Sequence, residues 1–184
     1  MYNANEKITE ILPNTYLIKL NRSNDERGSF VKTFNRSSLG GISPEVGNFD
    51  FQEEFYSISN ENVLRGMHFQ LPPHQHDKIV YCASGVVCDV LLDLRSGENY
   101  GKYFTFCLNS EIPEILFIPE GVAHGFMSLS NNSLMVYKTS SEYSPEHDFG
   151  IHYNTFGYTW INQEPIVSTR DQKHIDFSKF KSPF

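Results

Sequence analysis

The chain has 184 residues, which is enough for one well-packed domain and too few for two. A net charge of −7 without a basic stripe argues against an extended nucleic-acid surface, although a few local cations could still hold a small anionic ligand. The sequence has no apolar run long enough to span a membrane and no signal region in residues 1–7, and its three cysteines fit no zinc or redox spacing. We therefore expect a cytoplasmic protein in which Cys82, Cys88 and Cys107 are reduced core residues.

Short segments with strand character follow one another along the chain, separated by turns rich in Gly, Pro, Asn and Ser. In chain order these segments are residues 16–20, 29–34, 54–58, 62–70, 78–83, 86–94, 102–108, 114–118, 125–129 and 134–139. Helical turns are expected at residues 36–39 and 172–180, and the irregular aromatic stretch from 145 to 168 is expected to wrap the barrel or line its mouth. This pattern is typical of an all-β antiparallel sandwich or barrel, in a single domain over residues 1–184.

The segment at residues 62–70 places His68 on a predicted strand, three residues after Arg65. Because alternate strand residues point to the same side, positions 64, 66, 68 and 70 are expected on one face, and Arg65, Met67 and Phe69 on the other. A His68 that points into the barrel would be a shielded base. A core histidine bonded to the backbone explains this strand equally well.

Two histidine-containing turns raise the question of a metal. His74 and His76 form an HxH pair after two prolines, and His124 ends a Pro-x-Gly-x-x-His turn. These stretches resemble the signature motifs of the cupin superfamily, small double-sheet barrels whose metal-binding members use three histidines and a glutamate. The glutamate is missing here, because Val80 and Tyr81 stand in its place. We favour a solvated loop for His74 and His76, with a metal-dependent cupin enzyme using His74, His76 and His124 as the alternative.

A longer series of motifs covers roughly residues 12–172. It includes Asp-Glu-Arg-Gly-Ser-Phe at 25–30, Val-Leu-Arg-Gly-Met-His-Phe-Gln at 63–70, Ile-Pro-Glu-Gly-Val-Ala-His-Gly-Phe at 118–126 and Ser-Thr-Arg-Asp at 168–171. In this order and spacing, the motifs resemble the dTDP-4-dehydrorhamnose 3,5-epimerase family, whose members are metal-free cupin-like jelly rolls. The resemblance implies a cupin-type double-stranded jelly roll with a short C-terminal helical segment, and an isomerase that uses no cofactor.

The resemblance also implies a chemistry, the epimerisation of a nucleotide-diphospho-4-keto-6-deoxy sugar. The protons at C3 and C5 flank the keto group, so inversion needs a base, an acid on the opposite face of the ring and a cation at the enolate oxygen. By resemblance, His68 is the base and Asp171 orients it. Lys78 would stabilise the enolate oxygen, and Tyr137 would donate the proton from the other face. Taken alone, a solvent-facing Lys78 and a core Tyr137 remain open interpretations.

The diphosphate is expected to meet cations and hydrogen-bond donors, because the sequence has no glycine-rich phosphate loop. By resemblance, Arg65 and His124 approach the phosphates, while Arg27 and Phe30 help to hold the nucleotide, with a contact across a dimer interface as one arrangement. Taken singly, Arg27 and Arg65 could equally be surface ion-pair residues. We expect a homodimer, as is usual in the family, that serves deoxysugar synthesis for a surface polysaccharide.

One stretch departs from the family pattern. Gln52 is kept, but Glu54 stands where an asparagine usually helps to bind the nucleotide or phosphate. A carboxylate near a diphosphate is unfavourable unless it is paired. Thymidine, cytidine and guanosine are therefore all open as the nucleotide, and a heptose is open beside a hexose. Inversion at C3, at C5 or at both carbons is open as well.

Overall fold

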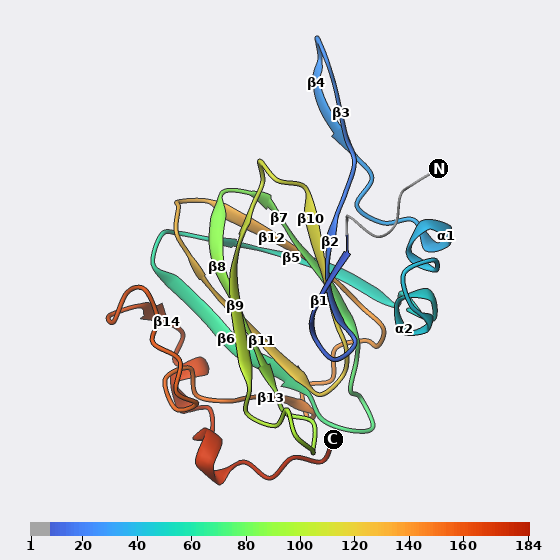
Figure 1. Cartoon of the computed structure of the whole chain (residues 1–184). Helices are drawn as coiled ribbons and strands as arrows, with labels where there is room; N and C mark the ends of the chain where they lie inside the picture. Colours follow the sequence, from blue (N-terminus) through green and yellow to red (C-terminus); the bar gives the residue numbers. More distant parts are fainter. Residues whose placement is uncertain (1–7) are drawn as a thin grey trace.

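The computed structural model describes residues 8–184, and its regular structure is almost entirely β (Figure 1). The strands are β1 (Ile8–Leu12), β2 (Thr15–Lys19), β3 (Arg22–Asp25), β4 (Gly28–Val31), β5 (Glu53–Ser59), β6 (Val63–Gln70), β7 (Lys78–Ser84), β8 (Val86–Asp93), β9 (Tyr103–Asn109), β10 (Glu114–Ile118), β11 (Val122–Ser128), β12 (Ser133–Thr139), β13 (Asp148–Gly150) and β14 (Ile166–Val167). The helical pieces are α1 (Arg36–Leu39), α2 (Pro44–Gly47) and the 3₁₀ turns η2 (Asp171–Lys173) and η3 (Phe177–Lys179). No helix in the described part of the chain is long and apolar enough to cross a membrane. The expectation about a signal region falls on residues 1–7, outside the described residues.

Most of these strands form two antiparallel sheets that face each other (Figure 1). The strand order is β1-β2-β10-β7-β12-β5 in the first sheet and β13-β6-β11-β8-β9 in the second, where β14 adds a short parallel partner to β6. This arrangement confirms the predicted all-β jelly roll of cupin type. The helical turns predicted at residues 36–39 and 172–180 are present as α1 and as η2 with η3.

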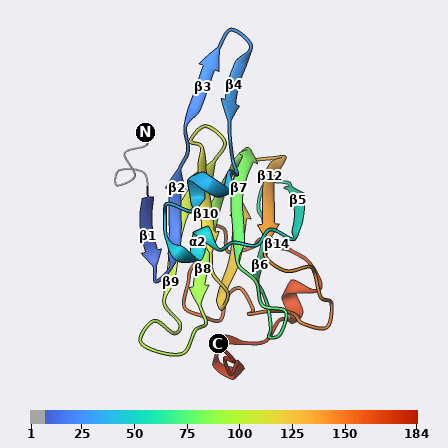
Figure 2. The ribbon, with the colours of Figure 1, turned by 90° about the vertical axis from the view of Figure 1, so that its right-hand side faces the viewer.

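Apolar side chains fill three layers rather than one. The layer between the sheets joins residues such as Val80 of the first sheet to Leu91 of the second. The outer face of the second sheet is covered by the C-terminal segment, including Trp160, and the outer face of the first by α1 and α2, including Val46 (Figure 2). Because both faces of the second sheet are covered, β8 is buried along nearly its whole length, and its sequence is apolar apart from Asp89 and the terminal Asp93.

Several strands and one helix of the structure differ from the elements predicted from the sequence. The strand β3 consists of Arg, Ser, Asn and Asp, so it has no apolar alternation, and it pairs only with β4 in a separate two-stranded ribbon. This ribbon projects from the body of the molecule in both views (Figures 1 and 2). The strand β11 begins at Val122, three residues earlier than predicted, because the turn ends at Gly121, whose φ of +78° favours glycine. The short elements β1, β13, β14 and α2 were not predicted.

The predicted alternation along β6 is wrong at one point. His68 pairs with His124 of β11, and Arg65 pairs with Phe126, so β6 uses one residue more than β11 between these pairs. A bulge of this kind reverses the alternation that follows it. Gly66 lies inside the bulge with a φ of +136°, and a Cβ atom there would come within 2.5 Å of the Cα of residue 125. As a result, Arg65 and His68 reach the same side of the sheet instead of opposite sides.

Candidate active site

A cavity of about 250 Å³ lies between the two sheets and is lined from both. The first sheet contributes Glu53, Phe55, Ser57, Lys78, Tyr137 and Thr139, and the second contributes Arg65, His68, Phe69, Gln70, His124, Phe126 and Asp148. Loop residues complete the lining with His76, Tyr143 and Arg170. Five residues predicted for the site therefore meet at one cavity, namely Arg65, His68, Lys78, His124 and Tyr137.

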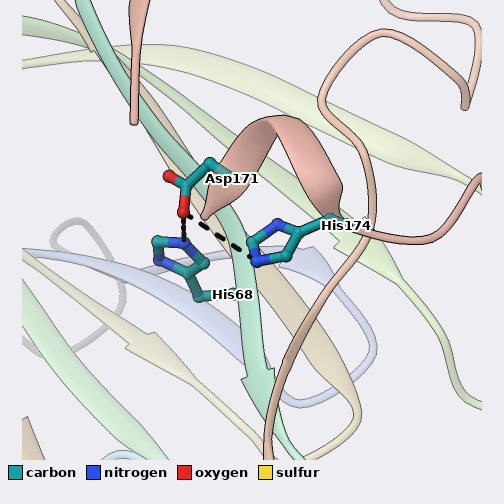
Figure 3. Close-up of side chains that lie close together, drawn as sticks. All are labelled: His68, Asp171 and His174. Carbon is teal, nitrogen blue, oxygen red and sulfur yellow. Dashed lines mark hydrogen bonds and ion pairs between the residues drawn. The ribbon is translucent and has the colours of Figure 1, made fainter. Parts of the chain in front are cut away.

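The carboxylate of Asp171 is hydrogen-bonded to the imidazole ring of His68 (Figure 3). The Nε2 atom of His68 donates to Oδ1 of Asp171 at 2.9 Å, and the other carboxylate oxygen accepts the backbone N–H of Gly66 at 3.2 Å. The turn η2, which begins at Asp171, packs on β6 and brings the carboxylate to this position although it lies more than a hundred residues away in the chain. A proton fixed on Nε2 leaves Nδ1 as the basic nitrogen of the neutral ring.

The protonation states of this pair suit a base with an anionic partner. Burial raises the pKa of Asp171, but the hydrogen bond and charge of His68 and the Gly66 amide outweigh it, so the pKa falls to about 2. Burial lowers the pKa of His68, and the hydrogen bond and charge of Asp171 compensate only in part. At neutral pH, the imidazole is therefore neutral and can accept a proton, while the carboxylate is ionised.

Lys78 begins β7 and points into the cavity from the first sheet. Its side chain is buried, and Nζ donates to the backbone carbonyl of His68 at 3.1 Å. Burial lowers the pKa of Lys78 to about 8; the nearby Asp148 opposes this shift, and Arg170 adds to it. Lys78 is thus mostly protonated at neutral pH, with its ammonium group bonded to the backbone of the histidine.

Tyr137 lies on β12, so it approaches the cavity from the wall opposite His68. Its ring stacks on Phe55 at 4.9 Å between centroids, and its hydroxyl lies 3.2 Å from Oγ of Ser57. Burial raises the pKa of Tyr137, so the phenol keeps its proton at neutral pH. A neutral imidazole and a protonated phenol therefore face each other across one cavity, a pair that can remove a proton on one side and supply one on the other.

A second histidine–aspartate pair lies next to the first. Nε2 of His124 and Oδ2 of Asp89 are hydrogen-bonded at 2.9 Å, and both side chains are almost fully buried. Burial raises the pKa of Asp89, and His124 opposes that shift. No site role was predicted for Asp89, which stands in the sequence as a carboxylate inside an apolar run.

Two arginines border the cavity with their side chains held in place. Nε of Arg65 donates to Oγ of Ser59 at 3.0 Å, and Nη2 donates to the carbonyl of Ile58 at 3.2 Å. Arg170, directly before Asp171, pairs with Asp148 at 2.7 Å. These guanidinium groups offer the planar donors that phosphate oxygens bind.

The ribbon formed by β3 and β4 carries two other residues predicted for the site. Arg27 pairs with Asp25 within the ribbon, and both side chains are solvent-exposed. Phe30 is 63% exposed and does not line the cavity. In the single chain, these residues thus lie apart from the predicted catalytic residues, and their roles stay predictions.

Gln52 and Glu54 also lie outside the cavity lining. Nε2 of Gln52 donates to Asp50 at 2.7 Å, and the carboxylate of Glu54 forms an ion pair with Lys138. The alternation of β5 turns Glu53, and not Glu54, toward the cavity. The carboxylate of Glu54 is therefore paired and lies outside the cavity lining, and its predicted effect on nucleotide binding stays a prediction.

The histidines of the alternative metal set are not brought together as ligands. The ring of His74 packs on His147 at 4.4 Å, Nδ1 of His76 lies 3.2 Å from Nε2 of Gln70, and His124 is bonded to its aspartate. The solvated loop predicted for the HxH pair fits the exposed His74, but it is wrong for His76, which is half-buried and lines the cavity. Among the described residues, the group with metal-ligand spacing is instead His68, Asp171 and His174. No role was predicted for His174 from the sequence.

Comparisons with known proteins agree with one another. The family model described as dTDP-4-dehydrorhamnose 3,5-epimerase matches residues 9–179. A relative of that name from Shigella flexneri is 37% identical over 179 residues, 94% of this chain and 97% of its own, and one from Mycobacterium tuberculosis is 40% identical over 165 residues, 86% of this chain and 80% of its own. A solved dTDP-6-deoxy-D-glucose-3,5-epimerase from Legionella pneumophila, in complex with dTDP-4-keto-L-rhamnose, has a TM-score of 0.87 and 29% identity, covering 95% of this chain and 93% of that chain.

Proposed function

The chain belongs to the dTDP-4-dehydrorhamnose 3,5-epimerase family, and we propose on this basis that it inverts C3 and C5 of a dTDP-linked 4-keto-6-deoxy hexose. The observation that carries the proposal is the placement of His68 and Tyr137 on opposite walls of one cavity. Epimerisation next to a ketone requires removal of a proton from one face and delivery of a proton to the other. A base and an acid on facing sheets meet that requirement without turning the sugar over.

Side chains in and beside the cavity can carry out each step of the epimerisation. Nδ1 of His68 takes the proton from C3 or C5, and the C–H electron pair passes into the enolate, whose oxygen lies at C4. The resulting imidazolium is stabilised by Asp171, whose Oδ1 is 2.9 Å from Nε2. Lys78 supplies positive charge to the enolate oxygen. The hydroxyl of Tyr137 then protonates the same carbon from the opposite face, and Arg65 favours the phenolate that this leaves. Solvent exchange restores both groups.

The size of the cavity indicates which part of the substrate it holds. Pockets for drug-sized ligands usually enclose about 300–1,000 Å³. A cavity of about 250 Å³ suits the sugar ring and leaves the nucleotide outside its mouth. The guanidinium groups of Arg65 and Arg170, together with His124, are the cations and donors that we assign to the diphosphate between them.

Thymidine is the nucleotide that the observations favour. The curated relatives carry dTDP in their names, and the Legionella structure contains a dTDP sugar. The reason for leaving cytidine and guanosine open was Glu54, and this carboxylate is paired with Lys138. We therefore propose a dTDP-linked hexose, used in the synthesis of a deoxysugar for surface polysaccharide.

The exposed apolar residues support a homodimer. Phe30 of the projecting ribbon and Tyr56 and Ile58 of the edge strand β5 are all more than half exposed. Exposed apolar side chains on an edge strand are typical of interaction surfaces. We propose that two copies associate through this side, so that Arg27 and Phe30 reach the nucleotide held by the partner subunit. Light scattering coupled to size-exclusion chromatography would give the mass of a dimer, and the mass of one chain would contradict this assignment.

We also propose that the protein acts in the cytoplasm as a single domain over residues 1–184. The three cysteines are free thiols, as expected in a reducing compartment. Cys82 and Cys88 are buried as predicted, but Cys107 is exposed, so its prediction as a core residue was wrong. Both sheets share one apolar layer, which fits one cooperative unit. A single calorimetric unfolding transition would agree with this, and two separate transitions would not.

Proton NMR in deuterium oxide tests the reaction directly. We expect the C3 and C5 proton signals of dTDP-4-dehydro-6-deoxyglucose to disappear in the presence of the enzyme, because each removed proton is replaced from solvent. The same sugar linked to CDP or GDP is the control for the nucleotide. Loss of one signal alone would identify a single-centre epimerase, and no loss with any of the three would overturn the proposed function.

A further inference from the structure

A third residue of ligand type completes a compact group around the predicted base. His174 follows η2, and its Nε2 lies 3.8 Å from Oδ1 of Asp171, the oxygen that already accepts Nε2 of His68 (Figure 3). The two imidazole rings meet edge to face, with centroids 5.3 Å apart. One ligand atom from each residue lies within 4.8 Å of the other two. Nothing in the proposed proton transfer uses His174.

The three side chains are held in this arrangement by separate contacts. The ring of His174 lies directly on Gly150, where a Cβ atom would come within 2.3 Å of it. The second oxygen of Asp171 is fixed by the Gly66 amide. Of the three, His68 is the most open, with 28% of its side chain exposed against 5% for Asp171 and 9% for His174. An ion would therefore reach the group from the cavity, past the face of His68.

The donor set is the one that zinc prefers. Two imidazole nitrogens and one carboxylate oxygen, with a further position for water, form a common tetrahedral site. Zinc–ligand bonds of about 2.0–2.1 Å place two ligand atoms about 3.3 Å apart. The separations of 2.9 Å and 3.8 Å from Oδ1 of Asp171 to the two imidazole nitrogens lie on either side of this value, and all three ligand atoms lie within 4.8 Å of one another. Small movements of the two rings would thus be enough to bind the ion.

We propose that Zn²⁺, or a divalent ion of similar preference, binds to Nε2 of His68, Oδ1 of Asp171 and Nε2 of His174 and inhibits the enzyme. A metal on Nε2 of His68 moves the ring proton to Nδ1. The nitrogen assigned to take the substrate proton then has no free electron pair, so proton removal stops. The binding of the ion stands on the geometry alone, and only the inhibition rests on the proposed function.

The structure also indicates that the ion would be exchangeable. Metal-binding histidines usually donate their second nitrogen to an acceptor, and loss of such a partner lowers metal affinity about 10- to 100-fold. Nδ1 of His174 is buried and has no hydrogen-bond partner among the described residues. We therefore expect binding that a chelator reverses, rather than a permanent structural zinc.

The first experiment measures metal binding without substrate. Chelator-treated full-length protein is titrated with Co²⁺, followed by the visible absorption of the bound ion, and Zn²⁺ is then added as competitor. We expect one Co²⁺ per chain, displaced by Zn²⁺, with affinity at least about tenfold weaker in His174→Ala and in the bulkier His174→Gln. The matched control is His147→Ala, which removes the partner of the separate His74 pair and should leave the affinity unchanged.

The second experiment measures solvent deuterium exchange into substrate with and without Zn²⁺. Wild-type exchange should slow with Zn²⁺ and recover with chelator, while His174→Gln should resist the same Zn²⁺ concentration. Absence of binding in the wild type, equal affinity in the His174 variants or loss of binding in His147→Ala would each overturn the proposed site. Metal binding in a protein that never exchanges substrate protons would leave the site standing and overturn the proposed function instead.

Discussion

The two histidine–aspartate pairs of this protein have the same internal geometry and different surroundings. His68 and His124 face each other across β6 and β11, and in each pair Nε2 lies 2.9 Å from the carboxylate. Asp171 receives a second hydrogen bond from a backbone amide, and its pKa falls to about 2. Asp89 is fully buried, one of its oxygens has no hydrogen-bond partner among the described residues, and burial raises its pKa.

The difference separates a base from a binding group. A histidine backed by a firmly ionised carboxylate gains a proton easily, because the imidazolium is stabilised as it forms. A histidine whose side chain is only 4% exposed, beside a carboxylate that burial disfavours as an anion, is better suited to hold a fixed donor toward a substrate. The hydrogen bond alone would not distinguish the two, whereas exposure and the state of the carboxylate do.

The largest expected effect is on the rate of proton removal. His68→Asn should lower the rate of solvent exchange at C3 and C5 about 100- to 10,000-fold, because the base is lost. His124→Asn should mainly raise KM and keep more of kcat, because it removes a contact made in the ground and transition states alike. Steady-state kinetics and deuterium exchange of both variants check this. Equal losses of kcat in the two variants would contradict the assignment of His68 as the base and of His124 as a binding group.

Stability should respond in the opposite order. His124→Asn leaves Asp89 buried without its partner, which we expect to lower the free energy of unfolding by about 3 kcal/mol. His68→Asn removes a more accessible group and should cost about 1 kcal/mol. Urea denaturation of both variants and the wild type gives these values. A larger loss in His68→Asn would mean that the exposed pair, and not the buried one, is the structural pair.

A variant of Tyr137, the predicted acid on the facing sheet, tests whether His68 removes the proton independently of the donor. Tyr137→Phe removes the hydroxyl and leaves the ring on Phe55, so folding should be little affected. Net inversion should fall about 100-fold, while exchange of the substrate proton with solvent falls less, because His68 still removes it. Product analysis and deuterium exchange on the same sample separate the two rates. The matched control is Phe55→Leu, which disturbs the stacking and keeps the hydroxyl; parallel losses of inversion and exchange in Tyr137→Phe would contradict its role as donor.

The smallest expected effect is a pH dependence set by Lys78. Its pKa of about 8 means that the charge at the enolate oxygen is present below that pH and is lost above it. The rate should therefore fall about tenfold per pH unit above pH 8, unless another group intervenes. The charged neighbours that face Lys78 are Asp148 and Arg170, and Asp148→Asn should move the fall to lower pH. The Lys78→Arg variant stays charged above pH 8. A fall in its rate at the same pH would therefore show that another group causes the pH dependence.

Much of the fold was predictable because strand and turn signals are local. All ten predicted segments overlap strands of the structure, because apolar residues and nearby turn residues mark them locally. Arg65, His68, Lys78 and Tyr137 lie within these segments. The bulge at Gly66 was not predictable, because it depends on how β6 pairs with β11. For the same reason, the sequence could not tell that Glu53, rather than Glu54, would face the cavity. The roles of Asp89 and His174 depend on their contacts with His124 and His68, which lie far away in the sequence.

The C-terminal segment has a consequence for the order in which the protein becomes active during synthesis. Strands β1 to β12 all precede residue 140, so the first sheet and the β6-β11-β8-β9 part of the second can pair before Asp171 has left the ribosome. The predicted base on β6 would then already be in place, although the carboxylate that orients it is still missing. Packing of the aromatic residues of this segment on the second sheet would deliver Asp171 as the chain closes. A chain made as far as β12 but not yet to Asp171 could therefore fold its barrel while its predicted base still lacks the carboxylate that orients it.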